Sequence, residues 1–326
     1  MTEAGQGSAS PLSGAVGKRV TIRLREAGGG FRDIVGILQN EYELINAKSE
    51  LIAFSKDEIA VWREIKPLPD KAGTGSPLSL RIKELEKLSD TTWPAAEIIE
   101  YGKWRLRISD GFTMRANSVL PTGAPPHGEP ATPLAEAVDY VIKTYLDKNL
   151  EPTFTIPLPI YQELDEYLES QGWQIKVAAQ FLIKDFETDN SEPPSGFDCV
   201  ISDSSSQEWL DLQSDHRLEI LMKRYPARYG VIKSGSTVIA VGRIATLGTW
   251  SIATRLFVEP SQRGKGVAKY LMNKLMAAAN SDGATKVGLQ VDSGNAAALA
   301  LYKSMGFRAH HSYTYRVLSK SVAECC

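Results

Sequence analysis

A glycine-rich segment with two basic side chains is the part of this sequence best suited to binding an anion. It reads Gln262-Arg263-Gly264-Lys265-Gly266-Val267 and follows the apolar run Leu256-Phe257-Val258, which is typical of a strand. Glycines let a backbone approach a ligand closely, and free N–H groups at the start of a helix attract negative charge. The pattern therefore predicts a pyrophosphate-binding turn between a strand and a helix. It matches neither the P-loop nor the dinucleotide-binding motif.

A second segment with candidate chemistry lies downstream, after a strand that is predicted to end at Asp292. Asn295 begins a predicted helix and Tyr302 lies within it, followed by Gly306 and Phe307. A phenol with its usual pKa of about 10 keeps its proton at neutral pH and can donate it to a leaving group. Tyr302 is therefore a side chain that can donate a proton at neutral pH.

Together the two segments resemble the GNAT acetyltransferases over residues 197–318. The resemblance rests on Val258-Glu-Pro260, Gln262-Arg-Gly-Lys-Gly-Val-Ala268, the helix that begins at Asn295, and Leu301-Tyr-Lys-Ser-Met-Gly-Phe307. It implies that Gln262 to Val267 hold the pyrophosphate of acetyl-CoA, and that Leu256, Phe257 and Val258 hydrogen-bond its pantetheine and acetyl groups. It also implies that Asn295 contacts the CoA arm and that Tyr302 protonates the leaving thiolate.

The whole chain resembles a narrower group, the actinobacterial histone-type or protein acetyltransferases with an SH3-like N-terminal domain. This resemblance rests on a strand-rich N-terminal part followed by Trp93-Pro94, Trp104-Arg-Leu-Arg107, Gly111-Phe-Thr113 and Arg115-Ala-Asn-Ser-Val119. It implies a protein lysine or another primary amine as the acceptor. The residues themselves do not identify that acceptor.

Composition and pattern divide the chain into five segments. We expect disorder in 1–15, a small SH3-like or Sm-like β-barrel in 16–70, a degenerate GNAT-like half in 78–188, the GNAT domain in 197–318, and a tail in 319–326. Linkers rich in proline, glycine or polar residues are predicted at 67–77 and 189–195. Short strands in the barrel are predicted at 19–24, 34–38, 42–45 and 58–62.

The order of helices and strands after residue 77 predicts an α+β mixed sheet and not a doubly wound fold. Helices are expected at 78–88, 132–146, 160–170, 207–222, 267–280 and 295–305. Strands are expected at 104–108, 116–120, near Trp173, and at 181–183, 229–233, 237–245, 249–258 and 286–292. The chain is expected to end in a β-pair with His310 and His311 in its solvated turn.

The middle part reads as a degenerate copy of the GNAT domain. An offset of 134 positions aligns Gly172-Trp173 with Gly306-Phe307, and the same offset places Leu168 where Tyr302 stands. It also places Pro130 and Pro133 in the counterpart of the phosphate loop, where proline has no N–H to donate. An unrelated α+β domain with coincident turns is the alternative. We therefore expect one acetyl-CoA site per chain.

Composition excludes several classes of function. The 326 residues include 37 basic and 39 acidic side chains, a net charge of −2, whereas nucleic-acid-binding proteins are usually clearly basic. No apolar run reaches the roughly 18 residues of a membrane span, and residues 1–14 lack the apolar stretch of a secretory signal. Cys199, Cys325 and Cys326 form no disulfide framework, and no zinc-binding spacing is present. We expect a cytoplasmic protein without a metal.

Charge is divided unevenly between the two halves. Residues 73–196 contain 11 basic and 19 acidic side chains, a net charge of −8, and residues 197–318 have a net charge of +6. A basic half would attract anionic CoA, and an acidic half would attract a cationic amine such as a lysine or a polyamine. Chance scatter of surface charge is the alternative.

Two features of the expected chemistry stay open at this stage. The general base is open: the predicted strand 250–258 contains no carboxylate, and Asp292, Glu259 and His216 remain as candidates, each with a surface or capping role as the alternative. The leading function is an acetyl-CoA-dependent N-acetyltransferase. The alternative is a non-catalytic acetyl-CoA sensor or scaffold whose N-terminal barrel recruits a partner.

Overall fold

The computed structural model describes residues 12–46, 50–65, 77–186, 196–213 and 217–319. Two compact units follow each other along the chain, Met1–Pro69 and Asp70–Cys326. Most of the predicted disordered start, the linkers and the tail lie outside the described residues. Within the described part of the start, Leu12–Ala15 form a short 3-10 helix whose Ala15 is buried.

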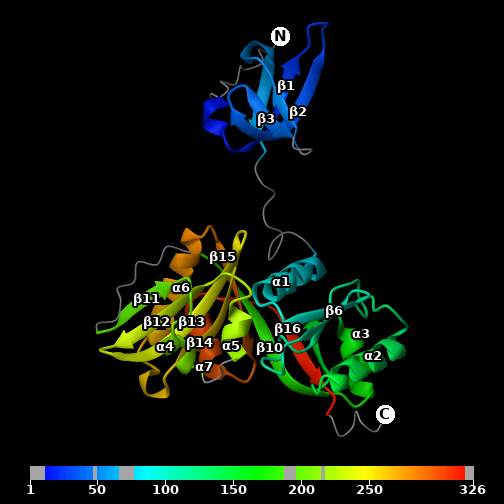
Figure 1. Cartoon of the computed structure of the whole chain (residues 1–326), viewed down its shortest axis with the longest axis vertical. Coiled ribbons are helices and arrows are strands. Elements are labelled where there is room, and N and C mark those ends of the chain that lie inside the picture. The colour runs from blue at the N-terminus through cyan, green and yellow to red at the C-terminus, as the bar shows by residue number, and fades with distance from the viewer. Residues whose placement is uncertain (1–11, 47–49, 66–76, 187–195, 214–216, 320–326) are drawn as a thin grey trace, which may run out of the picture. The chain divides into compact units, whose positions relative to one another are not determined.

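The N-terminal unit is a five-stranded antiparallel sheet (Figure 1). Its strands are β1 (Arg19–Arg25), β2 (Phe31–Asn40), β3 (Glu43–Asn46), β4 (Leu51–Ala53) and β5 (Ile59–Glu64). In β1 the buried Val20, Ile22 and Leu24 alternate with more exposed residues, as a half-buried strand requires. The order is β4-β3-β2-β1-β5, and among the described residues β4 and β5 each pair with one neighbour. The sheet is therefore open, and the predicted closed barrel is not seen.

The second unit contains one sheet of eleven strands in the order β11-β12-β13-β14-β15-β10-β16-β9-β8-β7-β6. The strands are β6 (Glu97–Tyr101), β7 (Trp104–Ile108), β8 (Val119–Pro121), β9 (Thr153–Leu158), β10 (Gln174–Asp185), β11 (Asp198–Ser202), β12 (Arg228–Ser234), β13 (Thr237–Leu247), β14 (Trp250–Val258), β15 (Lys286–Asp292) and β16 (Arg308–Val317). Seven helices among the described residues cover its faces: α1 (Leu78–Thr92), α2 (Leu134–Asp147), α3 (Gln162–Ser170), α4 (Gln207–Asp211), α5 (Arg217–Met222), α6 (Val267–Ser281) and α7 (Ala296–Ser304).

The sheet has two related halves that meet at β10 and β16. In each half a parallel pair, β8 with β9 or β14 with β15, leads into a helix and a final strand. The final strands, β10 of the first half and β16 of the second, are exchanged between the halves and pair with each other. Strand β10 also pairs with β15 of the second half, and β16 also pairs with β9 of the first half. This exchange gives the mixed α+β sheet and the tandem arrangement that the internal repeat predicts.

Helices pack on both faces of this sheet, as neighbouring side chains of β14 show. Ala253 packs in the cluster under α6, whereas its neighbour Ile252 packs with Leu85 of α1 and with Phe181. On the α1 face, Trp209 of α4 and Leu218 of α5 pack against β12 and β13. Helix α1 therefore lies over the middle of the sheet, with α4 and α5 on the same face (Figure 1).

Several predicted elements differ from the structure. The expected terminal β-pair is wrong, because β16 is a single strand that pairs on both sides with strands distant in sequence. Strands β4, β6, β9 and β11 are not among the predicted ones, and the helix predicted at 207–222 is observed as α4 and α5, with residues 214–216 not described. None of the described helices is long and apolar enough to cross a membrane.

Candidate active site

Strands β14 and β15 diverge and leave a gap between them. They pair from Trp250 with Lys286 to Ala253 with Leu289, and no further. Beyond this point β14 continues along β13 to Val258, while β15 continues along β10 to Asp292. Two adjacent parallel strands that separate in this way expose backbone groups of β14 to a ligand.

A β-bulge directs backbone groups at this end of β14. Between the paired residues Val241 and Arg243, β13 has one residue, whereas β14 has both Arg255 and Leu256 between Thr254 and Phe257. Arg255 takes the left-handed conformation, with φ of 58°. Such bulges redirect side chains and often lie beside active sites.

The backbone of Val258 points into the gap. The N–H of the next residue, Glu259, donates to the carbonyl of Ile239 in β13, at 2.9 Å. Because residues of an antiparallel pair alternate in the direction of their hydrogen bonds, Val258 directs its own N–H and carbonyl away from β13. Its carbonyl accepts a hydrogen bond from Arg263 Nε at 3.1 Å, and its N–H is available to a ligand.

The predicted phosphate loop lies directly beyond Val258, at the start of α6. Gly264 and Gly266 have φ of 76° and 78°, a conformation that favours glycine, and Gly266 is the N-cap of α6. Buried Val267, with Leu271 one turn further on, fixes the helix on the sheet while Arg263 to Gly266 stay exposed. Within the described chain, no acceptor receives the backbone N–H groups of residues 264–269.

This loop has the electrostatics of an anion site. The positive end of the α6 dipole and six free N–H groups face outward. Lys265 Nζ lies 3.0 Å from Gln262 Oε1, and the Arg263 guanidinium lies over the Phe257 ring, 6.0 Å from its centroid. The predicted residues Leu256 to Val258 and Gln262 to Val267 are therefore contiguous around one end of the gap.

Tyr302 of α7 belongs to the apolar cluster at the open end of the gap. The same cluster contains Val258 from the end of β14, Val267 from the start of α6 and Val291 from the end of β15. Tyr302 is 8% exposed, and burial raises the pKa of its phenol to about 12. Its hydroxyl makes no hydrogen bond to another described residue, so its proton is available to a ligand.

The other predicted site residues have local roles. Asn295 is the N-cap of α7, and its side chain accepts from the N–H of Ala298 at 3.1 Å. Asp292 is exposed and its carboxylate accepts from the N–H of Gly294 at 2.7 Å. Glu259 is half-buried, and His216 lies outside the described residues. None of these observations selects a general base.

The corresponding loop in the first half is closed by its own contacts. The Glu129 carboxylate accepts from the N–H of Ala124 at 3.0 Å, and the Glu129 carbonyl accepts from Lys103 at 2.7 Å. Pro133 is the N-cap of α2, and Leu168 is buried in the core at the place of Tyr302. A carboxylate thus takes a backbone N–H of this segment, and a leucine stands where the other half has Tyr302.

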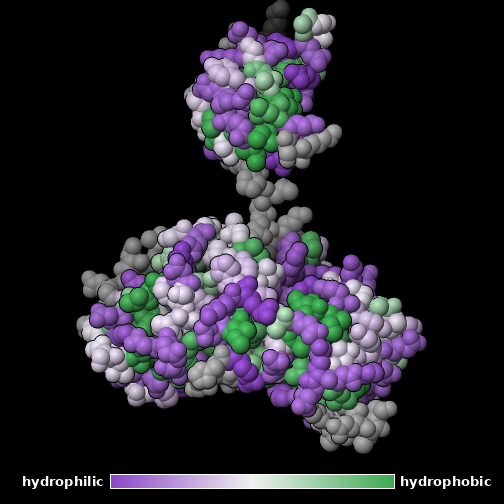
Figure 2. Space-filling model, in the orientation of Figure 1, coloured by the Kyte–Doolittle hydropathy of each residue, from purple (hydrophilic) through white to green (hydrophobic). Residues whose placement is uncertain are grey.

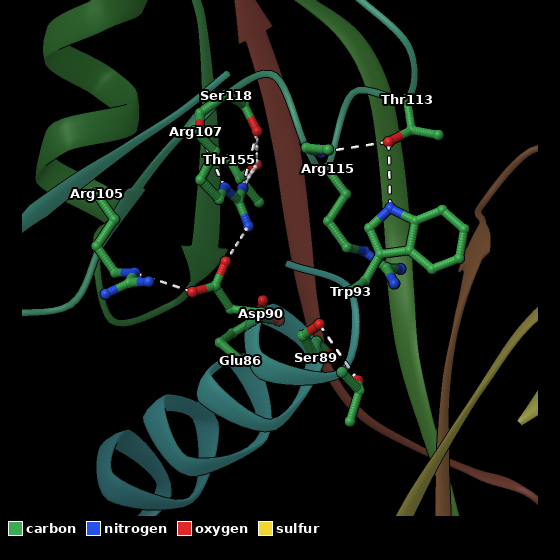
Figure 3. A network of polar contacts seen from close by, with 12 residues as sticks. Glu86, Ser89, Asp90, Trp93, Arg105, Arg107, Thr113, Arg115, Ser118 and Thr155 are labelled. Atoms are coloured by element: carbon green, nitrogen blue, oxygen red, sulfur yellow. Dashed lines mark hydrogen bonds and ion pairs between the residues drawn. The ribbon is translucent and has the colours of Figure 1, made fainter. Parts of the chain in front are cut away.

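A small cavity lies beside the bulge of β14, on the face covered by α1. Its volume is about 190 Å³, and it lies between the two halves. The second half contributes Ala253, Thr254, Arg255 and Tyr315, and the first half contributes Trp93, Thr113, Met114 and Arg115. Figure 3 shows Trp93 at the end of α1 reaching Thr113, with Arg115 close by. This cavity is suited to an acceptor that approaches the gap from the face opposite α6.

Arginines surround this cavity, although the first half as a whole is acidic. Arg243 of β13 is 1% exposed, and its Nη1 lies 3.4 Å from Thr254 Oγ1 at the cavity wall. Its guanidinium lies 5.2 Å from the centroid of the Trp93 ring, and burial lowers its pKa. Arg115 donates from Nη2 to Gln290 of β15. The lining residues include Arg115 and Arg255 and no carboxylate, and Arg243 lies behind Thr254 without lining the cavity itself.

Helix α1 joins the halves through polar contacts that sequence patterns did not reveal. Asp90 pairs with Arg105 and Arg107 of the first half, as Figure 3 shows. One turn earlier, Glu86 pairs with His311 at 2.8 Å. His311 is 7% exposed within β16, so its predicted place in a solvated turn is wrong. No local sequence signal links these residues, because strand exchange brings them together.

Comparisons with known proteins agree with this geometry. The family model described as "Probable histone acetyltransferase Rv0428c C-terminal" matches residues 80–316. The chain is 25% identical over 316 residues to "Probable histone acetyltransferase Rv0428c" of Mycobacterium tuberculosis, covering 92% of this chain and 94% of that protein. It is 26% identical over 257 residues to "Uncharacterized N-acetyltransferase YobR" of Bacillus subtilis, covering 72% of this chain and 98% of that protein.

Solved structures with the same fold include a GCN5-related N-acetyltransferase from Kribbella flavida. Its TM-score is 0.56 at 13% identity, over 72% of this chain and 95% of that chain. A tandem GNAT protein from the clavulanic acid biosynthesis pathway has a TM-score of 0.51 at 13% identity, over 77% of this chain and 89% of that chain. At these identities the likeness concerns the fold, and it agrees with a tandem arrangement.

Proposed function

The chain belongs to the family of the probable histone acetyltransferase Rv0428c and is a GNAT-type N-acetyltransferase, and from this premise we propose that it transfers the acetyl group of acetyl-CoA to a primary amine. The observation that carries the proposal is the gap between β14 and β15, with free backbone N–H groups at residues 264–269 at its mouth. A pyrophosphate fits this loop because the helix dipole and two basic side chains favour negative charge there.

The residues around the gap suit direct transfer between the two substrates. The amine nitrogen attacks the thioester carbonyl, a C–N bond forms, and the carbonyl oxygen becomes an oxyanion. The free N–H of Val258 is placed to stabilise that oxyanion. The C–S bond then breaks as the carbonyl re-forms, and the thiolate takes the proton of Tyr302. The amine loses its proton to solvent, and Tyr302 regains a proton from solvent. Holding both substrates at one gap also removes most of the entropic cost of their encounter.

The non-catalytic alternative, an acetyl-CoA sensor, is less favoured. A sensor needs the phosphate loop but has no use for a buried phenol whose proton is free. The acceptor class suggested by the relative's name is a histone lysine, and a small amine is the other candidate. A cytoplasmic location also stays part of the proposal, and it rests on the absence of a disulfide framework in the sequence.

Thiol release from acetyl-CoA tests the proposal. The full chain is incubated with acetyl-CoA and panels of small and peptide-borne amines, and free CoA and acetylated amine are both measured. We expect equal amounts of the two products for at least one amine. Tight acetyl-CoA binding without transfer to any primary amine would favour the sensor instead.

A further inference from the structure

The cavity beside the β14 bulge has a charge pattern that bears on the acceptor, and this inference rests on the proposed function. We propose that the acceptor is a small amine that also bears a carboxylate, and that Arg115 holds that carboxylate while the amine faces the gap, with the buried Arg243 adding positive charge behind the cavity wall. A lysine side chain within a protein brings only a cation to this place. The proposal therefore departs from the cationic acceptor that the net charge of the first half predicts.

Both arginines have guanidinium groups that the protein leaves incompletely paired. Arg243 donates to the carbonyls of Thr92 and Tyr225, at 3.1 and 3.3 Å, but its Nε is buried without an acceptor. The Nε of Arg115 is likewise buried without an acceptor. A buried N–H without a partner is costly, and for a charged group the cost is larger. Because Arg115 lines the cavity, an anion there can pair with its guanidinium, whereas Arg243 contributes its positive charge from behind the wall.

Among the described residues, no carboxylate forms an ion pair with Arg115 or Arg243. Glu86, a buried acid in α1, is engaged by His311 Nε2 at 2.8 Å and by Gln290 Nε2 at 3.4 Å. Gln290 in turn presents its oxygen to Arg115. Burial lowers the pKa of Arg243, and the like charge of Arg115 lowers it further, so the two guanidinium groups repel each other. A planar carboxylate matches the geometry of a guanidinium and would relieve this repulsion.

The positive field also fits the chemistry of the amine. The attacking nitrogen must be neutral, and nearby like charges disfavour the ammonium form. Arginines close to the amine thus favour its reactive form, which reduces the need for a dedicated base. The aromatic rings of Trp93 and Tyr315 line the remaining wall and suit the apolar part of a small molecule.

The visible surface does not favour a large apolar partner. Figure 2 shows hydrophilic residues over most of the visible face of the second unit, with apolar residues in small separate patches. Protein docking sites usually need larger continuous patches. A cavity of about 190 Å³ accommodates one small side chain or a free amino acid.

Paired substrates test the proposal on the full chain. A panel of free α-, β- and γ-amino acids is compared with their amides, their decarboxylated amines and a lysine peptide with blocked ends, by kcat/KM for acetyl transfer. We expect the best carboxylate to exceed its own amide by at least about tenfold. Equal rates for the two, or preference for the lysine peptide, would overturn the proposal.

Variants identify the residues responsible. Arg115→Gln should raise KM for the carboxylate at least about tenfold with little change in kcat or in KM for acetyl-CoA. Arg115→Lys should retain part of the affinity for the carboxylate because it keeps the charge. Arg308→Gln serves as the control, since Arg308 is an exposed residue of β16. Transfer to none of the carboxylates, with acetyl-CoA binding intact in calorimetry, would refute the substrate class and leave the acetyl-CoA assignment standing. Loss of acetyl-CoA binding itself would refute the proposed function.

Discussion

At the scale of single residues, Tyr302 both packs in the core and carries a hydroxyl that could react. Tyr302 packs edge to face on Phe307, with ring centroids 5.4 Å apart, yet its hydroxyl has no described partner. Sequence alone could identify Tyr302, because its role depends on a local motif. It could not identify Arg115, Arg243 or Glu86 as neighbours of the gap, because they come from strands and helices far apart in the chain.

Removing the phenol tests Tyr302. We expect Tyr302→Phe to lower kcat by about 100-fold, the scale of general acid catalysis, while the Kd for acetyl-CoA changes less than about twofold. Because burial raises the pKa of Tyr302 to about 12, its proton is retained throughout neutral and mildly alkaline pH. At any pH below 10, deprotonation of Tyr302 should therefore not reduce kcat.

Tyr145→Phe is the matched control for that variant. Tyr145 is a buried tyrosine of the first half whose hydroxyl donates to the carbonyl of Arg107 at 2.9 Å. Its removal should lower stability by about 1 kcal/mol without a specific effect on kcat. If both variants reduce turnover equally, Tyr302 has only a packing role.

At the scale of elements, the two glycines of the phosphate loop determine whether α6 can present its N–H groups. The helices and strands that depend on local pattern were predictable, including α2, α6 and β13, because apolar residues recur at helical or strand spacing. Strand β9 was not, because it pairs with the distant β16. Strands β6 and β11 were also missed, although each pairs with the next strand along the chain. The closed barrel was also wrong, since periodicity does not determine whether the edges of a sheet pair.

Replacing Gly266 by valine tests whether the phosphate loop binds acetyl-CoA. Gly266→Val should raise KM for acetyl-CoA at least about tenfold and cost about 1–2 kcal/mol, because a branched residue strains at positive φ. Nothing lies within 4 Å of an added Cβ there, so the cost comes from the backbone and not from a clash. Steady-state kinetics and thermal unfolding measure the two effects.

Gly283→Val provides a control at the other end of α6. Gly283 also has positive φ, of 94°, and no atom within 4 Å of an added Cβ. The strain is therefore similar, but the residue lies far along the helix from the loop. We expect a comparable loss of stability with an unchanged KM for acetyl-CoA. Equal changes of KM in both variants would mean that the loop does not bind the pyrophosphate.

At the scale of the whole molecule, our proposal assigns the phosphate loop and the candidate acid to one half, and part of the candidate acceptor cavity to the other. The exchange of β10 and β16 joins the halves into one sheet, and α1 contacts both through Asp90, Glu86 and the carbonyl of Thr92. The repeat itself was visible in the sequence as an offset of 134 positions. The cavity between the halves was not: Trp93, Thr113 and Arg115 belong to motifs of the narrower resemblance, but nothing in those motifs places them beside Ala253 and Thr254.

The most direct test of this account is a calorimetric titration of the full chain with acetyl-CoA. We predict one site per chain, because the loop of the first half is closed by Glu129, Pro130 and Pro133. The Gly264→Val and Gly266→Val variants should both weaken that site. Two tight sites per chain, no binding, or undiminished affinity in both variants would contradict the assignment of residues 262–267 as the acetyl-CoA site.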